Sequence, residues 1–563
     1  MKQQNLKLPS ASAFPKLNAK ALILQAFEHY RLKTCIDFKQ RTNEENYISV
    51  YKGSGCSSKV GNRQMGQQSL SIGSGCDRLA TIEHEFFHAL GFWHEQSRAD
   101  RDDYVTIMWD NIESGHSHNF NKYDDSTSDS LNVPYDYTSV MHYSKTSFSV
   151  GSSKPTIVTN IPAFNNVIGQ RMDFSDYDLL KLNRLYNCTR SLSFMEQCSF
   201  DEENICGMIQ RTDDGDDWQR VSQAKGGPST DHTVMSSCKD SGYFMYFSTA
   251  SGSTGKTGFL ESRLLYPKRG FQCLQFYYYN SGNENDELNV WVREYTSDNS
   301  EGKLQHIGKI KGKALGYWQL QHFSFNIKNK FRVVFEGVKG TGPSSGGFSI
   351  DDVNLSETRC PTDVWHIRNF AELLASMPPG TSGRIYSPRF YSSEGYGFQI
   401  SLYVNGKSDN PGNLAIYVHL TSGIYDNQLQ WPCPWRQVSM TLMDQHPDIR
   451  RRMSNQRSIT TDPTETTTSG GIEYYFWDRP DKIGSAVTDS DGTTFYRGPG
   501  KGTSTFISHE RLKSREFIKG DDIFILLTMQ GHCSDGAVLS KNGFDYAQLV
   551  CMHSGSTQIG PPT

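Results

Sequence analysis

The chain has 563 residues and a formal net charge of −4 at pH 7. Its basic residues are dispersed along the sequence, so nucleic acid is not expected as a partner. Its length is too great for one hydrophobic core and predicts three or four domains. Aromatic residues make up 12% of the chain and occur in short alternating runs typical of β-sandwiches, and no stretch approaches the roughly 18 consecutive apolar residues of a membrane span.

Cysteines and glycosylation sequons indicate the compartment. Twelve cysteines and two N-x-[ST] sequons, which begin at Asn187 and Asn354, favour a secreted, extracellular protein with glycans on both asparagines. Residues 1–17 are polar and show no apolar signal-peptide core, so we expect a disordered or atypical amino-terminal segment. A missing first exon or a processed fragment explains this combination more easily than a cytosolic protein does.

The first regular structure is expected from about residue 18. Apolar residues at helical spacing predict a helix over residues 18–32, and short strands are predicted over residues 34–38 and 47–51. The alternation of polar and apolar residues over 69–72 indicates an edge strand above a cleft. Asp77 is able to cap the next predicted helix, which continues to residue 89.

That helix carries the stretch His84–Glu95, which reads H-E-F-F-H-A-L-G-F-W-H-E. His84 and His88 are one helical turn apart, so both imidazoles can reach one Zn²⁺. Gly91 lets the chain leave the helix through a conformation that costs other residues more, and the turn brings His94 round as a third ligand. Three histidines leave one position for water, which is the open arrangement of a catalytic zinc site rather than a structural one.

The extended pattern H-E-x-x-H-x-x-G-x-x-H is the metzincin signature. Its continuation, H-E-Q-S-R over residues 94–98 and D-R-D over 100–102, resembles the astacin family more than other metzincins. Ser139–Tyr143 (S-V-M-H-Y) resembles the methionine-bearing turn that astacins carry beneath the metal. The resemblance implies an α+β, two-lobed metzincin domain over residues 18–189, without a recognisable first strand.

Family resemblance and chemistry together suggest a role for each residue of the site. With Zn²⁺ bound, Glu85 is expected to take a proton from the attacking water as general base and to pass it to the departing amine. Tyr143 resembles the astacin tyrosine that ligates zinc at rest and then stabilises the oxyanion, the alternative being a packed aromatic ring. Met141 is expected to pack beneath the metal, since a thioether is a poor zinc ligand.

The surroundings of the site carry further expectations. In astacins the glutamate after the third histidine, here Glu95, lies near an amino terminus produced by activation, so without that terminus Glu95 is expected to lack its partner. Because three good ligands exist, His116, His118 and His142 are not expected to bind the metal. Four charged residues are expected to form a structural ion-pair network: Arg98, Asp100, Arg101 and Asp102.

Arg171 is the expected specificity residue. In the family, the segment between the methionine turn and the closing cysteine lines the pocket for the residue just after the scissile bond, and Ile168–Arg171 (I-G-Q-R) falls there. A guanidinium in a partly desolvated pocket favours Asp or Glu. The alternative is that Arg171 only pairs with Asp173 or Asp176.

After Cys188 the sequence resembles two extracellular modules. F-D and N-I-C-G within residues 200–207, D-W-Q-R at 217–220 and G-G-F-S-I-D-D at 346–352 resemble a MAM domain, an adhesive and dimerising β-sandwich covering 193–360. V-W-H-I at 364–367, Y-S-P-R-F-Y at 386–391 and F-I-K-G-D-D at 517–522 resemble a MATH (TRAF-like) sandwich covering 361–527. The atypical tail, residues 528–563, resembles nothing recognisable.

The resemblances also imply a disulfide framework. The odd cysteine of the MAM region, Cys238, indicates an intermolecular bridge or a reactive thiol. We favour the bridge, which gives a disulfide-linked homodimer. The pairing of Cys433, Cys533 and Cys551 stays open. The implied pairs are Cys35–Cys188, Cys56–Cys76, Cys198–Cys206 and Cys273–Cys360.

The order astacin–MAM–MATH is that of the meprin family, and the sequence is most similar to its membrane-anchored type, which shares the acidic preference. An EGF-like module and a membrane helix are not recognisable, so we expect a soluble zinc endopeptidase that acts on extracellular proteins and peptides. The alternative is a catalytically impaired adhesion or scaffold form that works through its MAM and MATH domains. A purely structural zinc is disfavoured by the open fourth position and by Glu85.

Overall fold

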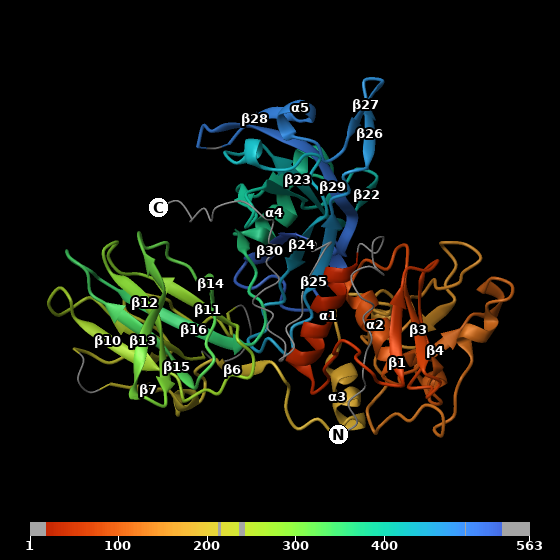
Figure 1. Ribbon diagram of the computed structural model, residues 1–563, viewed down its shortest axis with the longest axis horizontal. Helices are drawn as coiled ribbons and strands as arrows, with labels where there is room; N and C mark the ends of the chain where they lie inside the picture. Colours follow the sequence, from red (N-terminus) through yellow and green to blue (C-terminus); the bar gives the residue numbers. More distant parts are fainter. Residues whose placement is uncertain (1–18, 212–214, 236–241, 490, 532–563) are drawn as a thin grey trace.

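The computed structural model describes residues 19–211, 215–235, 242–489 and 491–531 (Figure 1). Figure 1 shows three bodies along the chain: one with helices and a small sheet, in red to orange, and two built of strands, in green and in teal to blue. This is the predicted α+β domain followed by two β-sandwiches. Within the described residues, no helix combines the length and apolar character that crossing a membrane requires.

The first body is built on two helices that pack together, α1 (Lys20–Lys33) and α2 (Leu79–Ala89). Beside them lies a sheet of β1 (Tyr47–Tyr51), β3 (Gln67–Ile72) and β2 (Cys56–Ser58), in that order. β3 pairs parallel to β1 and antiparallel to β2. Residues 69–72 therefore belong to the central strand, and the edge position predicted for them is wrong.

The chain after α2 forms a lobe with little regular structure. β4 (Val105–Ile107) pairs antiparallel with β5 (Ile157–Thr159), and α3 (Asp176–Leu185) follows. Single 3-10 turns account for much of the rest: η2 (Glu95–Ser97), η3 (Arg101–Asp103), η4 (Trp109–Asn111), η5 (Ser117–Phe120) and η6 (Pro162–Phe164).

Two further sequence expectations in the first body need correction. Residues 34–38 do not form the predicted strand: Ile36 and Phe38 are buried in the core, but the segment is irregular. Asp77 does not cap α2, whose N-cap is Arg78 without a side-chain hydrogen bond. The apolar side chains of residues 34–38 indicate only that the segment is buried. An irregular segment directly after α1 can bury them as well as a strand can.

The second body is a β-sandwich. Its elements are β6 (Phe194–Cys198), η7 (Ile205–Gly207), β7 (Ile209–Gln210), β8 (Gln219–Val221), β9 (Phe244–Ser248), β10 (Thr257–Glu261), β11 (Gln272–Asn280), β12 (Glu287–Thr296), β13 (Asn299–Lys311), β14 (Gln319–Phe325), β15 (Phe331–Val338) and β16 (Gly347–Ser356). One sheet has the order β13-β12-β15-β10-β7, and the other β14-β11-β16-β9-β8 with β6 also paired to β16. Large side chains such as Trp218, Phe247 and Phe335 fill the core.

The third body is also a sandwich. Its elements are β17 (Asp363–Ile367), α4 (Phe370–Ser376), η8 (Thr381–Gly383), β18 (Arg384–Tyr386), β19 (Phe390–Tyr391), β20 (Gly397–Tyr403), β21 (Gly406–Lys407), β22 (Asn410–Pro411), β23 (Asn413–Thr421), η9 (Asp426–Gln428), β24 (Arg436–Leu442), β25 (Asn455–Thr460), β26 (Thr466–Ser469), β27 (Ile472–Tyr475), α5 (Pro480–Ile483), β28 (Ser485–Thr488), β29 (Thr494–Ser508), α6 (His509–Leu512) and β30 (Ile523–Gly531). The sheets have the orders β17-β30-β24-β25 and β18-β20-β23-β29-β28, with β19 also paired to β20.

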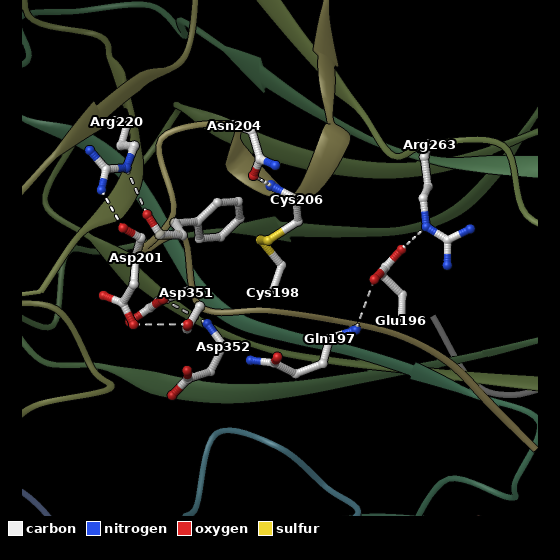
Figure 2. The surroundings of a disulfide bond; sticks show 12 residues. Glu196, Gln197, Cys198, Asp201, Asn204, Cys206, Arg220, Arg263, Asp351 and Asp352 are labelled. Carbon is white, nitrogen blue, oxygen red and sulfur yellow. Dashed lines mark hydrogen bonds and ion pairs between the residues drawn. A yellow bond between two sulfur atoms is a disulfide. The ribbon is translucent and has the colours of Figure 1, made fainter. Parts of the chain in front are cut away.

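Four disulfides are present in the pairs that the resemblances imply: Cys35–Cys188, Cys56–Cys76, Cys198–Cys206 and Cys273–Cys360. Figure 2 shows the third, beside which Asn204 accepts a hydrogen bond from the backbone N–H of Cys206. Cys433 is a free, buried thiol whose pKa is raised to about 12 by burial. The remaining cysteines, Cys238, Cys533 and Cys551, lie outside the described residues.

The two sequons differ in accessibility. Asn187 is exposed. Asn354 is 0% exposed, and its Nδ2 donates to the carbonyls of Asp352 (3.1 Å) and Pro447 (2.7 Å) between the second and third bodies. A glycan on that nitrogen would remove a donor hydrogen and has no room, so glycosylation of Asn354 is inconsistent with the folded chain.

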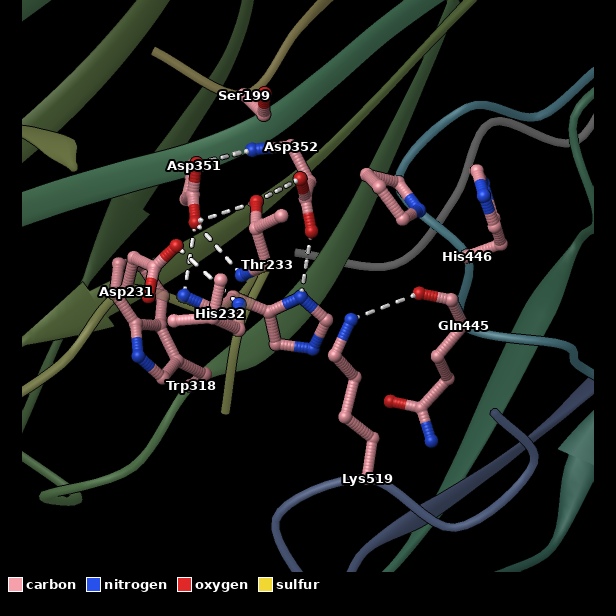
Figure 3. A network of polar contacts seen from close by, with 12 residues as sticks. Ser199, Asp231, His232, Thr233, Trp318, Asp351, Asp352, Gln445, His446 and Lys519 are labelled. Carbon is pink, nitrogen blue, oxygen red and sulfur yellow. Dashed lines mark hydrogen bonds and ion pairs between the residues drawn. The ribbon is translucent and has the colours of Figure 1, made fainter. Parts of the chain in front are cut away.

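The three bodies pack against one another. Lys33 of α1 donates to the carbonyl of Arg452 (2.7 Å) in the third body, and Arg452 Nη1 donates to Gln275 Oε1 (2.7 Å) in the second. Figure 3 shows the junction of the two sandwiches, where His232 donates from Nδ1 to Asp352 (2.7 Å) beside Lys519. A single residue, Arg452, thus links all three bodies.

Candidate active site

The three predicted ligands converge. α2 presents His84 and His88 from one face, Gly91 takes a φ of +107° after the helix ends, and the turn brings His94 back to them. The ligand atoms of the three imidazoles all lie within 4.8 Å of one another, and the Nε2 atoms of His88 and His94 are 3.1 Å apart. This separation suits two nitrogens that share one tetrahedral cation.

The outer nitrogens of two ligands are held by the backbone. His84 donates from Nδ1 to the carbonyl of Val140 (2.8 Å), and His88 donates from Nδ1 to the carbonyl of Phe92 (2.7 Å). Both Nε2 lone pairs are therefore free for a metal. Burial lowers the pKa of His88 to about 4 and the pKa values of His84 and His94 well below their usual range, so all three are neutral at pH 7. Neutral, inward-facing imidazoles fit Zn²⁺.

The methionine turn is held by α3. Asp178, in the first turn of α3, accepts hydrogen bonds from Ser139 Oγ (2.5 Å) and from the backbone N–H of Val140 (2.8 Å). Asp178 and Ser175 also form a capping box. Because Val140 in turn accepts from His84, Asp178 orients a ligand through one backbone carbonyl. Asp178 was not predicted from the sequence, although the pattern S-x-x-D before an apolar run is a capping signal.

Buried Glu85 and half-buried Arg171 lie close enough for their charges to interact. Glu85 is 5% exposed, its Oε2 has no hydrogen-bond partner within the described residues, and burial raises its pKa to about 7 although nearby Arg171 opposes the rise. Burial also lowers the pKa of Arg171 to about 10, which leaves the guanidinium charged at neutral pH. A carboxyl group whose pKa is close to neutral pH, beside three imidazoles, is suited to proton transfer.

Arg171 has no carboxylate partner in the described part of the chain: its Nη1 donates to the carbonyls of His142 (3.3 Å) and Gln170 (2.7 Å). Asp173 instead pairs with Lys33 (2.7 Å), and Asp176 with Arg451 (3.0 Å). The alternative that Arg171 only balances one of these aspartates is therefore wrong.

Tyr143 lies beside one of the three histidines, and Met141 lies in the core around α2. The ring of Tyr143 lies 4.3 Å from that of His94 between centroids, and burial raises the pKa of its phenol to about 12. Its backbone N–H donates to the fully buried Gln96 (3.0 Å), a contact that the sequence did not reveal. Met141 belongs to the core cluster around α2.

Glu95 does not lack a partner, which corrects the sequence expectation. It is buried, it forms an ion pair with Lys181 of α3, and its Oε1 accepts from Arg98 Nη1 (3.2 Å) and the backbone N–H of Asp136 (3.0 Å). The predicted ion-pair network is also present: Arg98 pairs with Asp100 (2.8 Å) and Arg101 with Asp102 (2.9 Å). Lys181 was not predicted from the sequence. Its position on the buried face of α3, which also carries Asp178 and Leu182, is the signal that could have indicated it.

The remaining histidines near the site do not converge on it. His116 and His118 stack at 6.5 Å between ring centroids, and His116 also stacks on Phe148. His142 accepts from the Tyr135 hydroxyl at Nε2 (2.7 Å) and donates from Nδ1 to the carbonyl of Tyr143 (2.7 Å). None of the three belongs to the group that could hold the metal.

A second group of potential ligands consists of His29 of α1, Glu83 of α2 and Asp173. His29 Nδ1 is 3.0 Å from Glu83 and 3.4 Å from Asp173, and Lys33 Nζ is 2.7 Å from Asp173. Each carboxylate therefore has a cationic neighbour, and we interpret the group as a buried ion-pair cluster and not as a metal site.

Comparison with known proteins agrees with this geometry. Residues 11–187 match the model of the astacin peptidase family, residues 198–361 the MAM domain (meprin/A5/mu) model and residues 362–529 the MATH domain model. The chain is 64% identical to meprin A subunit beta of Homo sapiens over 92% of its own length and 72% of that protein. It is 48% identical to meprin A subunit alpha of Rattus norvegicus over 91% and 68%, respectively.

Among solved structures, high choriolytic enzyme 1, a hatching enzyme zinc-protease from Oryzias latipes, matches 33% of this chain and 89% of its own, at 44% identity and a TM-score of 0.30. The fold, the histidine site and the family matches together define an astacin-type zinc metalloendopeptidase with MAM and MATH domains. The chain belongs to the meprin family. Its cofactor is Zn²⁺.

Proposed function

We propose that this meprin-family chain hydrolyses peptide bonds of extracellular proteins and peptides with Glu85 as general base. Held by His84, His88 and His94, the zinc ion would supply Lewis acidity to the attacking water and to the scissile carbonyl. Glu85 accepts the proton of the water and delivers it to the departing amine. The observation that supports this role is the buried Oε2 of Glu85, which has no hydrogen-bond partner among the described residues, together with a pKa raised to about 7.

Tyr143 is the proposed donor to the developing oxyanion. With a pKa of about 12, its phenol keeps its proton at neutral pH, and its ring lies against His94. A preorganised donor of this kind contributes about 3–4 kcal/mol in enzymes where one has been removed. Glu95 pairs with Lys181 and Arg98, so its surroundings give no support to the adhesion or scaffold alternative.

Arg171 is the proposed determinant of specificity. Its guanidinium is half-buried, its charge interacts with that of Glu85 and, within the described residues, it forms no ion pair. A partly desolvated cation without a paired carboxylate favours an anionic ligand, since the ligand supplies the missing partner. We therefore propose a preference for Asp or Glu just after the scissile bond.

The test of this specificity is the hydrolysis of two quenched-fluorescent peptides that differ only in Glu or Gln after the scissile bond. Arg171→Ala should reduce kcat/KM for the Glu peptide by about 30-fold, as expected for loss of a charge-assisted pair, and leave the Gln peptide nearly unchanged. An unchanged ratio between the two peptides would show that Arg171 does not select the residue.

We also propose that the chain is secreted, carries a glycan on exposed Asn187 and forms a disulfide-linked homodimer through Cys238. The support is the pairing of the four other MAM-region cysteines, Cys198 with Cys206 and Cys273 with Cys360, which leaves Cys238 over. Non-reducing electrophoresis should show a dimer for the wild type and a monomer for Cys238→Ser; a dimer that survives this change would exclude the bridge.

A further inference from the structure

The segment that carries Arg171, residues 166–172, lies between the protease domain and the MATH domain. Ile168 is buried in the hydrophobic cluster of the irregular protease lobe. Met172, only four residues later, belongs to the buried cluster of the MATH sandwich. The specificity segment is thus anchored at one end in the protease domain and at the other in a different domain.

A MATH residue also contacts the backbone of this segment. Arg511, on α6, donates from Nε to the carbonyl of Asn166 (3.2 Å) and from Nη2 to the carbonyls of Val167 (3.5 Å) and Ile168 (3.4 Å). Three consecutive carbonyls therefore face one guanidinium. Burial is the main cause of the lowered pKa of Arg171, and the positive charge of Arg511 lowers it further. The two guanidinium groups are therefore close enough to repel each other.

Between its anchors the segment has little freedom. Gly169 has a φ of +76°, and a Cβ there would lie 2.3 Å from Ser144 Cα. Gln170 donates from Nε2 to the carbonyls of Thr138 and Asp173, each at 2.8 Å, and its Oε1 accepts from the backbone N–H of Met172 (2.6 Å). A shift of the carbonyls that Arg511 holds would consequently be transmitted to Arg171.

We propose that the MATH domain forms part of the pocket for the residue after the scissile bond. Arg511 is a positioning residue that holds backbone 166–168, and thereby Arg171, from outside the protease domain. It also places a second positive charge behind the pocket, which favours an acidic substrate side chain. The inference rests on the specificity role proposed for Arg171 and extends it to a residue of another domain.

The experiment uses the full chain with the same Glu and Gln peptides. Arg511→Ala should lower the Glu-to-Gln ratio of kcat/KM about fivefold, mainly by raising KM for the Glu peptide. Arg511→Lys, which keeps the charge, should retain at least half of the wild-type ratio. The matched control is Arg451→Ala, which removes an exposed ion pair with Asp176 at the same interface but does not contact residues 166–172.

Three outcomes separate the proposals. A reduced ratio for Arg511→Ala, with partial rescue by lysine and an unchanged ratio for Arg451→Ala, supports the inference. Two results overturn this inference alone and make Arg511 only an interface residue. One is an equal loss of kcat/KM on both peptides in Arg511→Ala. The other is a wild-type Glu-to-Gln ratio in Arg511→Ala, Arg511→Lys and Arg451→Ala while Arg171→Ala still lowers that ratio. An unchanged ratio in Arg171→Ala overturns both proposals. Zinc content measured for each variant identifies any loss that comes from misfolding.

Discussion

The zinc ligands depend on residues that never contact the metal. The Nδ1 of His84 donates to Val140, whose own N–H donates to Asp178, so a carboxylate at the start of α3 fixes the orientation of a ligand in α2. The sequence predicted the three ligands because their spacing is set by helix geometry and by Gly91. It did not predict Asp178 or Gln96, because their roles depend on the packing of segments far apart in sequence.

Asp178→Ala tests this chain of hydrogen bonds. Alanine has no side-chain acceptor, so the bonds from Ser139 and Val140 are both lost and His84 is less well held. We expect zinc affinity to fall about 10–100-fold, as it does when partners of metal ligands are removed elsewhere. Competition with a fluorescent chelator measures this affinity. Asp176→Ala, an exposed neighbour on α3, is the control, and equal affinities for the two variants would contradict the account.

At the scale of elements, periodicity predicted α1 and α2 within two residues of their ends. The alternating runs indicated β-sandwiches, and the resemblance to MAM and MATH domains gave their number as two. It did not distinguish the central strand β3 from an edge, because strand order depends on partners that alternation does not specify. The segment over 462–471, which lacks an apolar pattern and suggests a loop, contains β26 of a hairpin with β27. Cross-strand hydrogen bonds can form a hairpin without burying a hydrophobic face.

The element that presents Arg171 should tolerate no side chain at Gly169. Gly169→Ala combines a left-handed backbone with a Cβ 2.3 Å from Ser144 Cα, so we expect a loss of about 2–4 kcal/mol in the stability of the protease domain. The thermal unfolding midpoint measures it. Gly151→Ala is the control, because a Cβ there meets nothing within 4 Å. Matching midpoints for the two variants would show that the segment adapts more easily than the structure indicates.

The three domains are held together by contacts that local sequence patterns do not predict. Lys33 reaches both Asp173 and the carbonyl of Arg452, 419 residues away, and Gln25 and Gln456 exchange amide hydrogen bonds across the same interface. Beside them, His29 lies between Glu83 and Asp173. Burial opposes the charge on His29, but the two carboxylates outweigh it and raise its pKa to about 10.

This raised pKa predicts a pH-dependent contribution to stability. Because the folded-state pKa of about 10 lies above the ordinary histidine pKa of 6.5, charged His29 stabilises the fold fully below pH 6.5, and this contribution is lost as the pH rises through 10. His29→Gln should therefore cost about 2 kcal/mol at pH 6 and progressively less toward pH 10. Denaturation at several pH values measures it, with exposed His118→Gln as control. A cost independent of pH would contradict the ion-pair interpretation.

The measurement that tests the account most directly is the rate at which the purified, zinc-loaded chain cleaves the Glu peptide, beside Glu85→Gln with matched zinc content. Removing the general base while leaving the three histidines intact should lower kcat by about 10²–10⁴-fold, and a zinc chelator should abolish the remaining wild-type rate. A Glu85→Gln enzyme within tenfold of the wild type, or a folded, zinc-loaded wild type without cleavage, would contradict the proposed mechanism.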